Sequence, residues 1–124
     1  MLWQCGSAFY EGRKLSNSAV ADFHRKLNQA EYEVICNTAD ESFRKGSNEA
    51  ELLDFLRLVH TRLGAAGATS LQNISINTSM NQTLITTRYN TTFSEDSAVE
   101  IFTWAKKDGA LKLFGYHVQS DKFK

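Results

Sequence analysis

The stretch AVEIFTWAKKDGALKLFGYHVQ, residues 98–119, alternates apolar and polar side chains on both sides of an Asp-Gly pair. This period of two is typical of β-strands, because successive side chains of a strand point to opposite faces of a sheet. Asp108 and Gly109 suit the positive φ angles of a type I′ turn, which joins neighbouring strands. The stretch therefore predicts an antiparallel hairpin of residues 98–107 and 110–119.

Two further strands are predicted before this hairpin, at residues 70–78 and 83–93, where β-formers alternate with polar residues. Turns centred on Met80-Asn81 and Glu95-Asp96 would join consecutive strands into a four-stranded antiparallel meander. Residues 64–68, rich in glycine and alanine, are interpreted as a flexible connector that precedes the first strand.

The first half of the chain has a helical period instead, with apolar residues three or four positions apart. The first helix is predicted over residues 17–28. The second is predicted over residues 30–46, with Asn28 and Glu31 as a capping box, and the third from residue 47 or 48 to Gly64. The three apolar stripes are Val20, Phe23, His24 and Leu27; Tyr32, Ile35, Cys36, Ala39 and Phe43; and Leu52, Phe55, Leu56, Val59 and Leu63.

Three N-terminal helices followed by a meander predict an α+β domain in which helices cover one face of the sheet. We expect residues 16–124 to form this single domain, because a chain of 124 residues is long enough for one core. Residues 1–15 are expected to be a flexible N-terminus or the remnant of a signal sequence. Leu2-Trp3-Gln4-Cys5 is similar to a bacterial lipobox, which would make Cys5 a lipid anchor. Cys36 is interpreted as a packed thiol, with a bridge to Cys5 as the alternative.

The charge pattern excludes some classes of partner. Fourteen Lys and Arg residues balance fourteen Asp and Glu residues, whereas a nucleic-acid-binding domain normally carries a basic stripe. We therefore expect no nucleic-acid partner. No apolar run reaches the roughly 18–20 residues that a membrane span requires. The histidines lack metal-site spacing and no phosphate loop is visible, so neither a metal nor a cofactor is expected.

The turns also set the strand registers, and the registers give the two faces of the sheet different characters. They pair Ile76 with Ile85, Tyr89 with Phe102, and Phe102 with Gly115. The face predicted to meet the helices carries Ile74, Ile76, Ile85, Tyr89, Phe93, Phe102, Trp104, Leu111 and Leu113. The opposite face is polar in its first two strands, but it also carries an apolar group made of Leu84, Val99, Ile101, Phe114, Tyr116 and Val118. Because a large exposed apolar patch usually marks an interface or a ligand site, this group predicts a homodimer interface or a ligand-binding surface.

Three stretches carry a resemblance to a known fold: ADFHRKLNQAEYEVICNTADESFRKG, LRLVHTRLGA, and YNTTF followed by VEIFTWAKKDGALKLFGYHVQS. Over about residues 18–121 the chain resembles the cystatin-like, nuclear-transport-factor-2-like fold, and more closely small bacterial extracytoplasmic proteins of unknown function. The resemblance implies a periplasmic or cell-envelope location, with a cytoplasmic location as the alternative. It assigns no catalytic residues. In the wider superfold, it implies a cone-shaped pocket that binds ligands or hosts catalysis.

Glu100 is the first catalytic candidate, because an inward carboxyl group beside Tyr89 and Trp104 would have its pKa raised and act as a general acid. Its alternative role is a structural carboxylate that accepts hydrogen bonds from Thr or backbone donors. His60 and His117 are the other catalytic candidates, and the predicted register turns His117 towards the helices. His24 and His60 lie on or beside apolar stripes, which is also typical of buried histidines with local hydrogen bonds. Four aromatic residues predict a ligand pocket, and the alternative is that they are ordinary core residues: Tyr89, Phe102, Trp104 and Tyr116.

These patterns favour a small binding or interaction domain that is not an enzyme and that pairs with a second copy or binds an apolar ligand through its sheet. One alternative is an enzyme of the isomerase or hydratase type, with a carboxylate or a histidine in a cone-shaped pocket. A third is a structural assembly subunit without a ligand.

Overall fold

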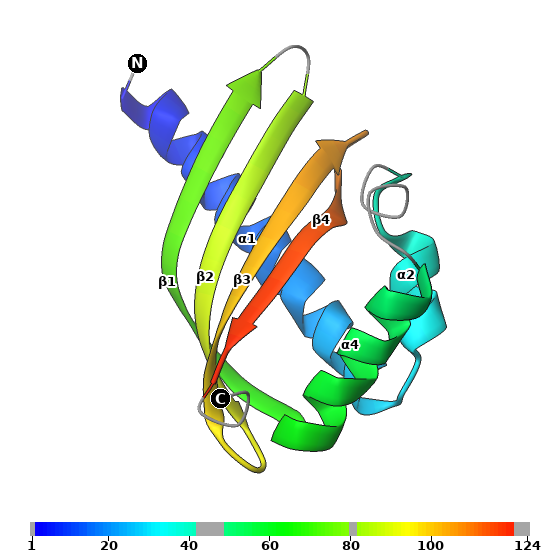
Figure 1. The fold of residues 1–124 in the computed structure, drawn as a ribbon. Helices are drawn as coiled ribbons and strands as arrows, with labels where there is room; N and C mark the ends of the chain where they lie inside the picture. Colours follow the sequence, from blue (N-terminus) through cyan, green and yellow to red (C-terminus); the bar gives the residue numbers. More distant parts are fainter. Residues whose placement is uncertain (1, 42–48, 80–81, 121–124) are drawn as a thin grey trace.

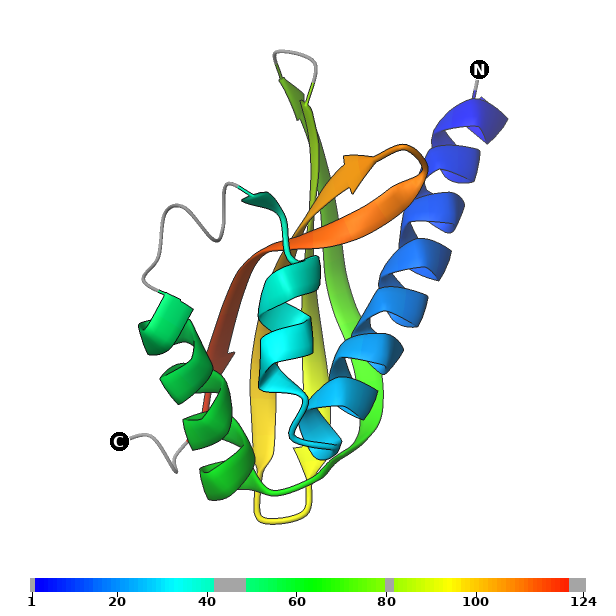
Figure 2. The same ribbon diagram turned by 90° about the vertical axis from the view of Figure 1, so that its right-hand side faces the viewer.

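Helices cover one face of a four-stranded antiparallel sheet (Figures 1 and 2). The computed structural model describes residues 2–41, 49–79 and 82–120. The helices are α1 (Leu2–Asn28), α2 (Tyr32–Thr38) and α4 (Glu49–Leu63). The strands β1 (Ala66–Ser79), β2 (Gln82–Phe93), β3 (Ser97–Lys107) and β4 (Ala110–Gln119) pair in chain order. The predicted α+β meander is confirmed, although β1 begins inside the stretch interpreted as a connector.

Helix α1 begins at Leu2 rather than at residue 17, so residues 2–15, expected to be a flexible terminus, are helical. Packing against the first two strands explains the longer helix. A Cβ atom on Gly12 would lie 3.4 Å from Cδ1 of Ile76 and 3.7 Å from Cδ1 of Ile74. Helices gain most of their stability from such tertiary packing, which the spacing of apolar residues on the helix does not reveal. The origin of this segment as a signal remnant, and the lipid anchor at Cys5, stay predictions.

The capping box predicted Asn28 as the N-cap of α2, but Asn28 is the last residue of α1. Its side-chain amide donates a hydrogen bond to the backbone oxygen of Ala66 at 3.0 Å, and its Oδ1 accepts one from Ala66 N–H at 2.8 Å. The side chain therefore fastens the end of α1 to the start of β1. The capping prediction was wrong because this contact across 38 positions uses the same amide.

Helix α2 ends at Thr38, well before the predicted residue 46. Ala39 adopts an extended conformation, and the backbone N–H of Asp40 donates to the carbonyl oxygen of Leu113 in β4 at 2.8 Å. The buried carboxylate of Asp40 pairs with Nζ of Lys107 at 2.6 Å. These contacts with the last hairpin stop the helix. The remainder of the predicted helix, including Phe43 and Gly46, lies outside the described residues.

Two further predictions for the helical half of the chain concern the thiol of Cys36 and the third helix, α4. Cys36 is a buried free thiol, as expected, and burial raises its pKa to about 11. The apolar stripe of α4 lies in the core, and the helix ends at Leu63, just before Gly64, whose φ of 82° suits glycine. No helix in the described part of the chain is both long and apolar enough to cross a membrane.

The predicted register agrees with the structure between β1 and β2, but it differs between β2 and β3 and in part of the last hairpin. The pairing of Ile76 with Ile85 is confirmed. Between β2 and β3, however, Tyr89 lies opposite Glu100 and not opposite Phe102. The inward and outward faces of both strands stay as predicted, because moving the pairing by two positions preserves the alternation of side chains.

Helix α4 accounts for this displaced register. The backbone N–H groups of Ser94 and Glu95, in the turn between β2 and β3, donate to the carbonyl oxygens of Ala65 and Leu63 at 2.9 and 2.8 Å. The turn is therefore fixed by the end of α4 and by the residue that precedes β1. The Glu95-Asp96 pair indicates a turn in the sequence, but it does not indicate that the turn contacts the end of α4.

A register shift in the last hairpin changes which side chains face inward. Trp104 lies opposite Leu113 as predicted, but Phe102 lies opposite Tyr116 and not opposite Gly115. Strand β4 has one extra residue at this point, which is the definition of a β-bulge. Such a bulge moves every later residue of β4 to the opposite face from the one that simple alternation predicts.

Because of the bulge, three residues of β4 lie on the opposite face from the one predicted. Val118, expected on the outward face, is buried in the core, and Tyr116, also expected there, packs against the inward Phe102 with ring centroids 5.0 Å apart. His117, expected to face the helices, is exposed. The outward apolar group keeps only four half-buried members, Leu84, Val99, Ile101 and Phe114.

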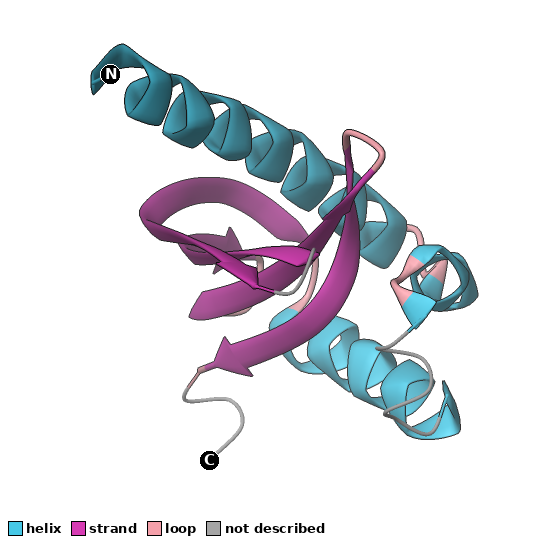
Figure 3. Ribbon diagram, turned by 90° about the horizontal axis from the view of Figure 1, so that it is seen from above, coloured by secondary structure: helices cyan, strands magenta, loops and turns pink. Residues whose placement is uncertain are grey.

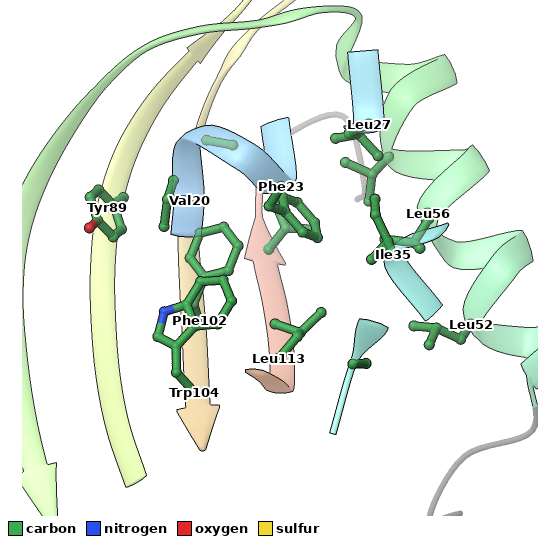
Figure 4. Close-up of a cluster of buried hydrophobic side chains, with 14 of the residues drawn as sticks. Val20, Phe23, Leu27, Ile35, Leu52, Leu56, Tyr89, Phe102, Trp104 and Leu113 are labelled. Carbon is green, nitrogen blue, oxygen red and sulfur yellow. The ribbon is translucent and has the colours of Figure 1, made fainter. Parts of the chain in front are cut away.

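The hydrophobic core lies between the strongly curved sheet and the helices (Figures 3 and 4). Phe102 is at its centre, with no exposed surface. Its ring stacks on Trp104 at 5.3 Å and 9°, and meets the edge of Phe23 from α1 at 5.1 Å and 82°. Burying one such aromatic side chain stabilises a fold by roughly 1.5–3 kcal/mol. All nine residues predicted for the inward face belong to this core or pack against it.

Two glycines with positive φ differ in their surroundings and give a matched pair of variants. Gly109→Ala should lower the free energy of unfolding by about 1–2 kcal/mol, because a φ of 78° strains any residue with a Cβ. No further cost is expected, since this Cβ would meet nothing within 4 Å. Gly64→Ala should cost more, because its Cβ would lie 1.9 Å from Oγ of Ser94 and would displace this hydroxyl from its hydrogen bond with the backbone N–H of Ala65. Urea unfolding would measure both, and equal losses would contradict the close contact between Gly64 and Ser94.

Candidate functional site

A buried polar cluster surrounds the carboxylate of Glu100, which has no exposed surface. Oε1 of Glu100 lies 2.7 Å from Nε2 of His24 and accepts a hydrogen bond from Oγ1 of Thr91 at 2.6 Å. Oε2 accepts a hydrogen bond from the hydroxyl of Tyr116 at 2.5 Å. Four elements, α1, β2, β3 and β4, therefore each contribute one side chain to this Glu100 cluster.

Local structure explains why these side chains meet. His24 follows Val20 by one helical turn on the inward face of α1. Glu100 is two residues before Phe102 on the inward face of β3, and Tyr116 reaches the same face only because of the bulge in β4. Edge-on contacts with Phe93 and Phe102 hold the imidazole ring, at centroid distances of 6.1 and 6.2 Å. The cluster is thus a polar island in an aromatic core.

The electrostatics of the cluster fix its donors. Burial raises the pKa of Tyr116 well above its usual value, and the negative charge and the hydrogen bond of Glu100 raise it further. The phenol therefore stays protonated and donates to Oε2. Because Oε1 of Glu100 lies 2.7 Å from Nε2 of His24, we assign a ring proton to Nε2, which then donates to this oxygen. With three donors, the carboxylate of Glu100 is satisfied by the protein itself.

A second polar group lies further along the same interface between α1 and the sheet. The buried hydroxyl of Ser16 contacts Oγ1 of Thr87 at 3.2 Å and the hydroxyl of Tyr89 at 3.0 Å. Tyr89 donates to Oδ1 of Asn17 at 2.7 Å, and burial raises the pKa of its phenol. Tyr89, predicted as a ligand contact, is therefore a core residue whose hydroxyl holds α1 in place.

Two surface recesses lie beside α1. The first, called the Trp104 recess, has a volume of about 140 Å³ and lies between α1, α2 and the last hairpin. It is lined by Ala19, Asp22, Phe23, Lys26, Ile35, Thr38, Trp104, Leu111 and Leu113. The second, called the His24 recess, is more open and lies between the end of α1 and the start of β1. It is lined by Ala21, His24, Arg25, Asn28, Gln29, Ala66, Gly67 and Thr69.

The walls and the mouth of the Trp104 recess differ in chemistry. The walls are the apolar and aromatic side chains of the core. At the mouth, Oδ2 of Asp22 lies 2.7 Å from Nζ of Lys26. Oδ1 of Asp22 lies 2.6 Å from Nη2 of Arg25, a residue that lines the His24 recess instead. The hydrogen bonds from Lys26 and Arg25 lower the pKa of Asp22, so its carboxylate stays charged. An apolar pocket with a few polar groups at its rim is the usual form of a small-molecule site.

The predicted catalytic residues do not come together. Glu100 is in the buried cluster, whereas His60 accepts or donates a hydrogen bond at 2.7 Å through Nδ1 to the hydroxyl of Tyr32, between α4 and α2. His117 is exposed on the outward face of β4. Among the described residues, no group of three or more His, Cys, Asp or Glu side chains has the arrangement of a metal site. Catalytic roles for Glu100, His60 and His117 stay predictions.

The predicted ligand contacts and interface residues are likewise dispersed. Of the four aromatic residues, Trp104 lines the recess named after it, Phe102 is in the centre of the core, and Tyr116 belongs to the Glu100 cluster. Self-association through the outward group stays a prediction, now for the four residues that remain there. His24 was missing from the predicted site residues. Its position on the apolar stripe of α1, together with an inward Glu100, could have indicated that the two side chains meet.

Replacing one tyrosine would measure how much the cluster contributes to stability. Tyr116→Phe leaves Oε2 of the buried Glu100 without this donor and should lower the free energy of unfolding by about 1–3 kcal/mol. The matched control is Tyr32→Phe, which removes a half-buried hydroxyl bonded to His60 and should cost about 0.5–1.5 kcal/mol. Urea unfolding would compare the variants. A smaller loss for Tyr116→Phe than for Tyr32→Phe would contradict the buried acceptor.

Comparison with known proteins supports the fold alone. No family model and no curated protein sequence matches the chain. Among solved structures, the chain is similar to one described as a "putative dehydratase from the NTF2-like family" of Streptomyces avermitilis. The TM-score is 0.54 at 11% identity, over 86% of this chain and 94% of that one.

A second similar structure is Bd1075 of Bdellovibrio bacteriovorus, with a TM-score of 0.53 at 15% identity. The match covers 86% of this chain but 41% of the longer Bd1075 chain. At these identities the likeness concerns architecture and not activity. The fold of the chain is therefore NTF2-like.

Proposed function

We propose that this protein binds a small, largely apolar molecule in the Trp104 recess. The observation that carries the proposal is the combination of aromatic walls with a charged mouth in a recess of about 140 Å³. An apolar cavity of about 150 Å³ is known to accept one benzene molecule. The recess therefore has room for a single ring or a short branched chain, and not for a large cofactor.

The size of the recess also limits the affinity. Small ligands gain at most about 1.5 kcal/mol per non-hydrogen atom, and usually much less. A six- to eight-atom molecule buried against Phe23, Trp104 and Leu113 would therefore bind with a Kd between about millimolar and micromolar.

Binding is favoured over catalysis because of the state of Glu100. Its two oxygens already accept three hydrogen bonds from His24, Thr91 and Tyr116. A general acid or base must reach the proton it transfers within hydrogen-bond distance of the substrate. Glu100 would first have to break one of these bonds, whereas a ring can contact the apolar walls of the Trp104 recess without breaking a hydrogen bond of Glu100.

Two alanines on α1 provide a matched test of the binding proposal. Ala19 lines the Trp104 recess, while Ala21, two positions further on the same helix, lines the His24 recess. One-ring compounds such as benzyl alcohol and benzoate should raise the melting temperature of the wild type by a few degrees, because they bind the native state. Ala19→Leu, which fills the first recess, should abolish the shift, and Ala21→Leu should keep it. Shifts that survive Ala19→Leu, or that never occur, contradict the proposal.

A second candidate function is acid–base catalysis at His24, in an enzyme of the isomerase or hydratase type. The observation that favours it is the position of the imidazole, which is held by Glu100 through Nε2 and borders the open His24 recess. A carboxylate that fixes one ring nitrogen leaves the other available as a base. Arg25, Asn28 and Gln29 around the recess would then orient a polar substrate.

This candidate makes its own prediction. Hydration of α,β-unsaturated carbonyl compounds, followed by ultraviolet absorbance, should be faster with the wild type than in buffer. His24→Gln should reduce the rate by about 10²–10⁴-fold, the usual contribution of a general acid or base. Ala21→Leu should also slow the reaction, whereas Ala19→Leu should not. Turnover that His24→Gln leaves unchanged would contradict a catalytic role for this histidine.

A further inference from the structure

We infer that the Trp104 recess selects a one-ring carboxylic acid and that Lys26 binds its carboxylate. The inference rests on the proposed binding function and names the class of ligand. Two features carry it: the placement of the Lys26 ammonium at the mouth of an aromatic-walled recess, and the uneven sharing of charge among Asp22, Arg25 and Lys26.

Lys26 differs from Asp22, the other charged residue that lines this recess, and from Arg25, which lines the His24 recess. Its side chain is only 16% exposed, against 47% for Asp22 and 55% for Arg25. The aliphatic part of Lys26 therefore lies along the recess wall, and the ammonium group lies at its rim. A ring that enters the recess would present a substituent to this cation.

The charges of Asp22 and its two ion-pair partners favour an anion. One carboxylate, that of Asp22, pairs with two cations, Arg25 and Lys26, at 2.6 and 2.7 Å. The three side chains therefore carry a net charge of +1. When a ligand carboxylate takes Lys26, Asp22 keeps Arg25, and every charge has a partner. A cationic ligand would instead meet the net positive charge, and it would have to displace a lysine or an arginine from Asp22.

The walls account for the ring. Phe23 and Trp104 offer aromatic surface, and Leu111 and Leu113 close the side formed by the last hairpin. Figure 4 shows the indole nitrogen of Trp104 on the side of its ring turned towards β2 and away from Leu113. The tryptophan therefore presents carbon atoms to the recess. Lys26 is left as the donor that selects the polar end of the ligand, since the hydroxyl of Thr38 already donates to Val34 and Ile35 carbonyls.

The test compares ligands that share one ring and differ in charge: benzoate, benzamide and benzylamine. Their affinities would be measured by quenching of Trp104 fluorescence in a Trp3→Phe background, with calorimetry as a check. We expect benzoate to bind at least about tenfold tighter than benzamide, and benzylamine to bind weakest. Lys26→Gln should bring the benzoate-to-benzamide ratio close to one. Arg25→Gln is the matched control, because it removes the same charge from Asp22 outside the recess, and it should keep most of the preference.

The outcomes separate the inference from the proposed function. If benzamide binds as tightly as benzoate, and Ala19→Leu abolishes both, the recess is a binding site but the choice of a carboxylic acid is wrong. If Lys26→Gln keeps the tenfold preference, Lys26 is not the carboxylate contact. If none of the three compounds binds at millimolar concentration, the inference and the proposed function both fail.

Discussion

The carboxylate of Glu100 lies inside an apolar core, and its burial constrains much of the molecule. A buried carboxylate without partners would cost several kcal/mol, so its donors must be in place in the folded state. They come from α1, β2 and β4, and His24 is 76 positions away in the chain. The position of α1, the register of β2 on β3 and the bulge in β4 are therefore each coupled to one hydrogen bond. A native state with any of the three altered would leave an oxygen of Glu100 unsatisfied.

This coupling explains which features could be predicted from the sequence. The four strands, the Asp108-Gly109 turn and the nine residues predicted for the inward face follow from local alternation, and these agree with the structure. The β2–β3 register and the end of α2 depend on backbone hydrogen bonds between distant segments, so no local pattern contains them. The bulge is of the same kind. It changed the predicted positions of Tyr116, His117 and Val118 although each lies in a correctly predicted strand.

The site was harder to predict than the fold for a physical reason. Glu100 drew attention because a carboxylate between Val99 and Ile101 is unusual in a strand, and its inward direction was correctly expected. Its partners could not be identified, because His24 resembles any other member of an apolar helical stripe. The Trp104 recess is less visible still. It is formed by side chains that also read as ordinary core, and its charged mouth follows the i, i+3 and i+4 spacing found on many exposed helices.

The edge of β4 bears on how copies of this protein can meet. An open sheet edge is a template on which another strand can be added, and such edges are a common start of aggregation. Here the bulge interrupts the hydrogen-bonding pattern of β4, and the backbone N–H of Asp40 occupies the carbonyl oxygen of Leu113 just before it. Only short stretches of the edge remain available on either side. The same irregularity that turns Tyr116 towards Glu100 therefore protects this border against strand addition, and it disfavours any assembly built by extending the sheet through β4.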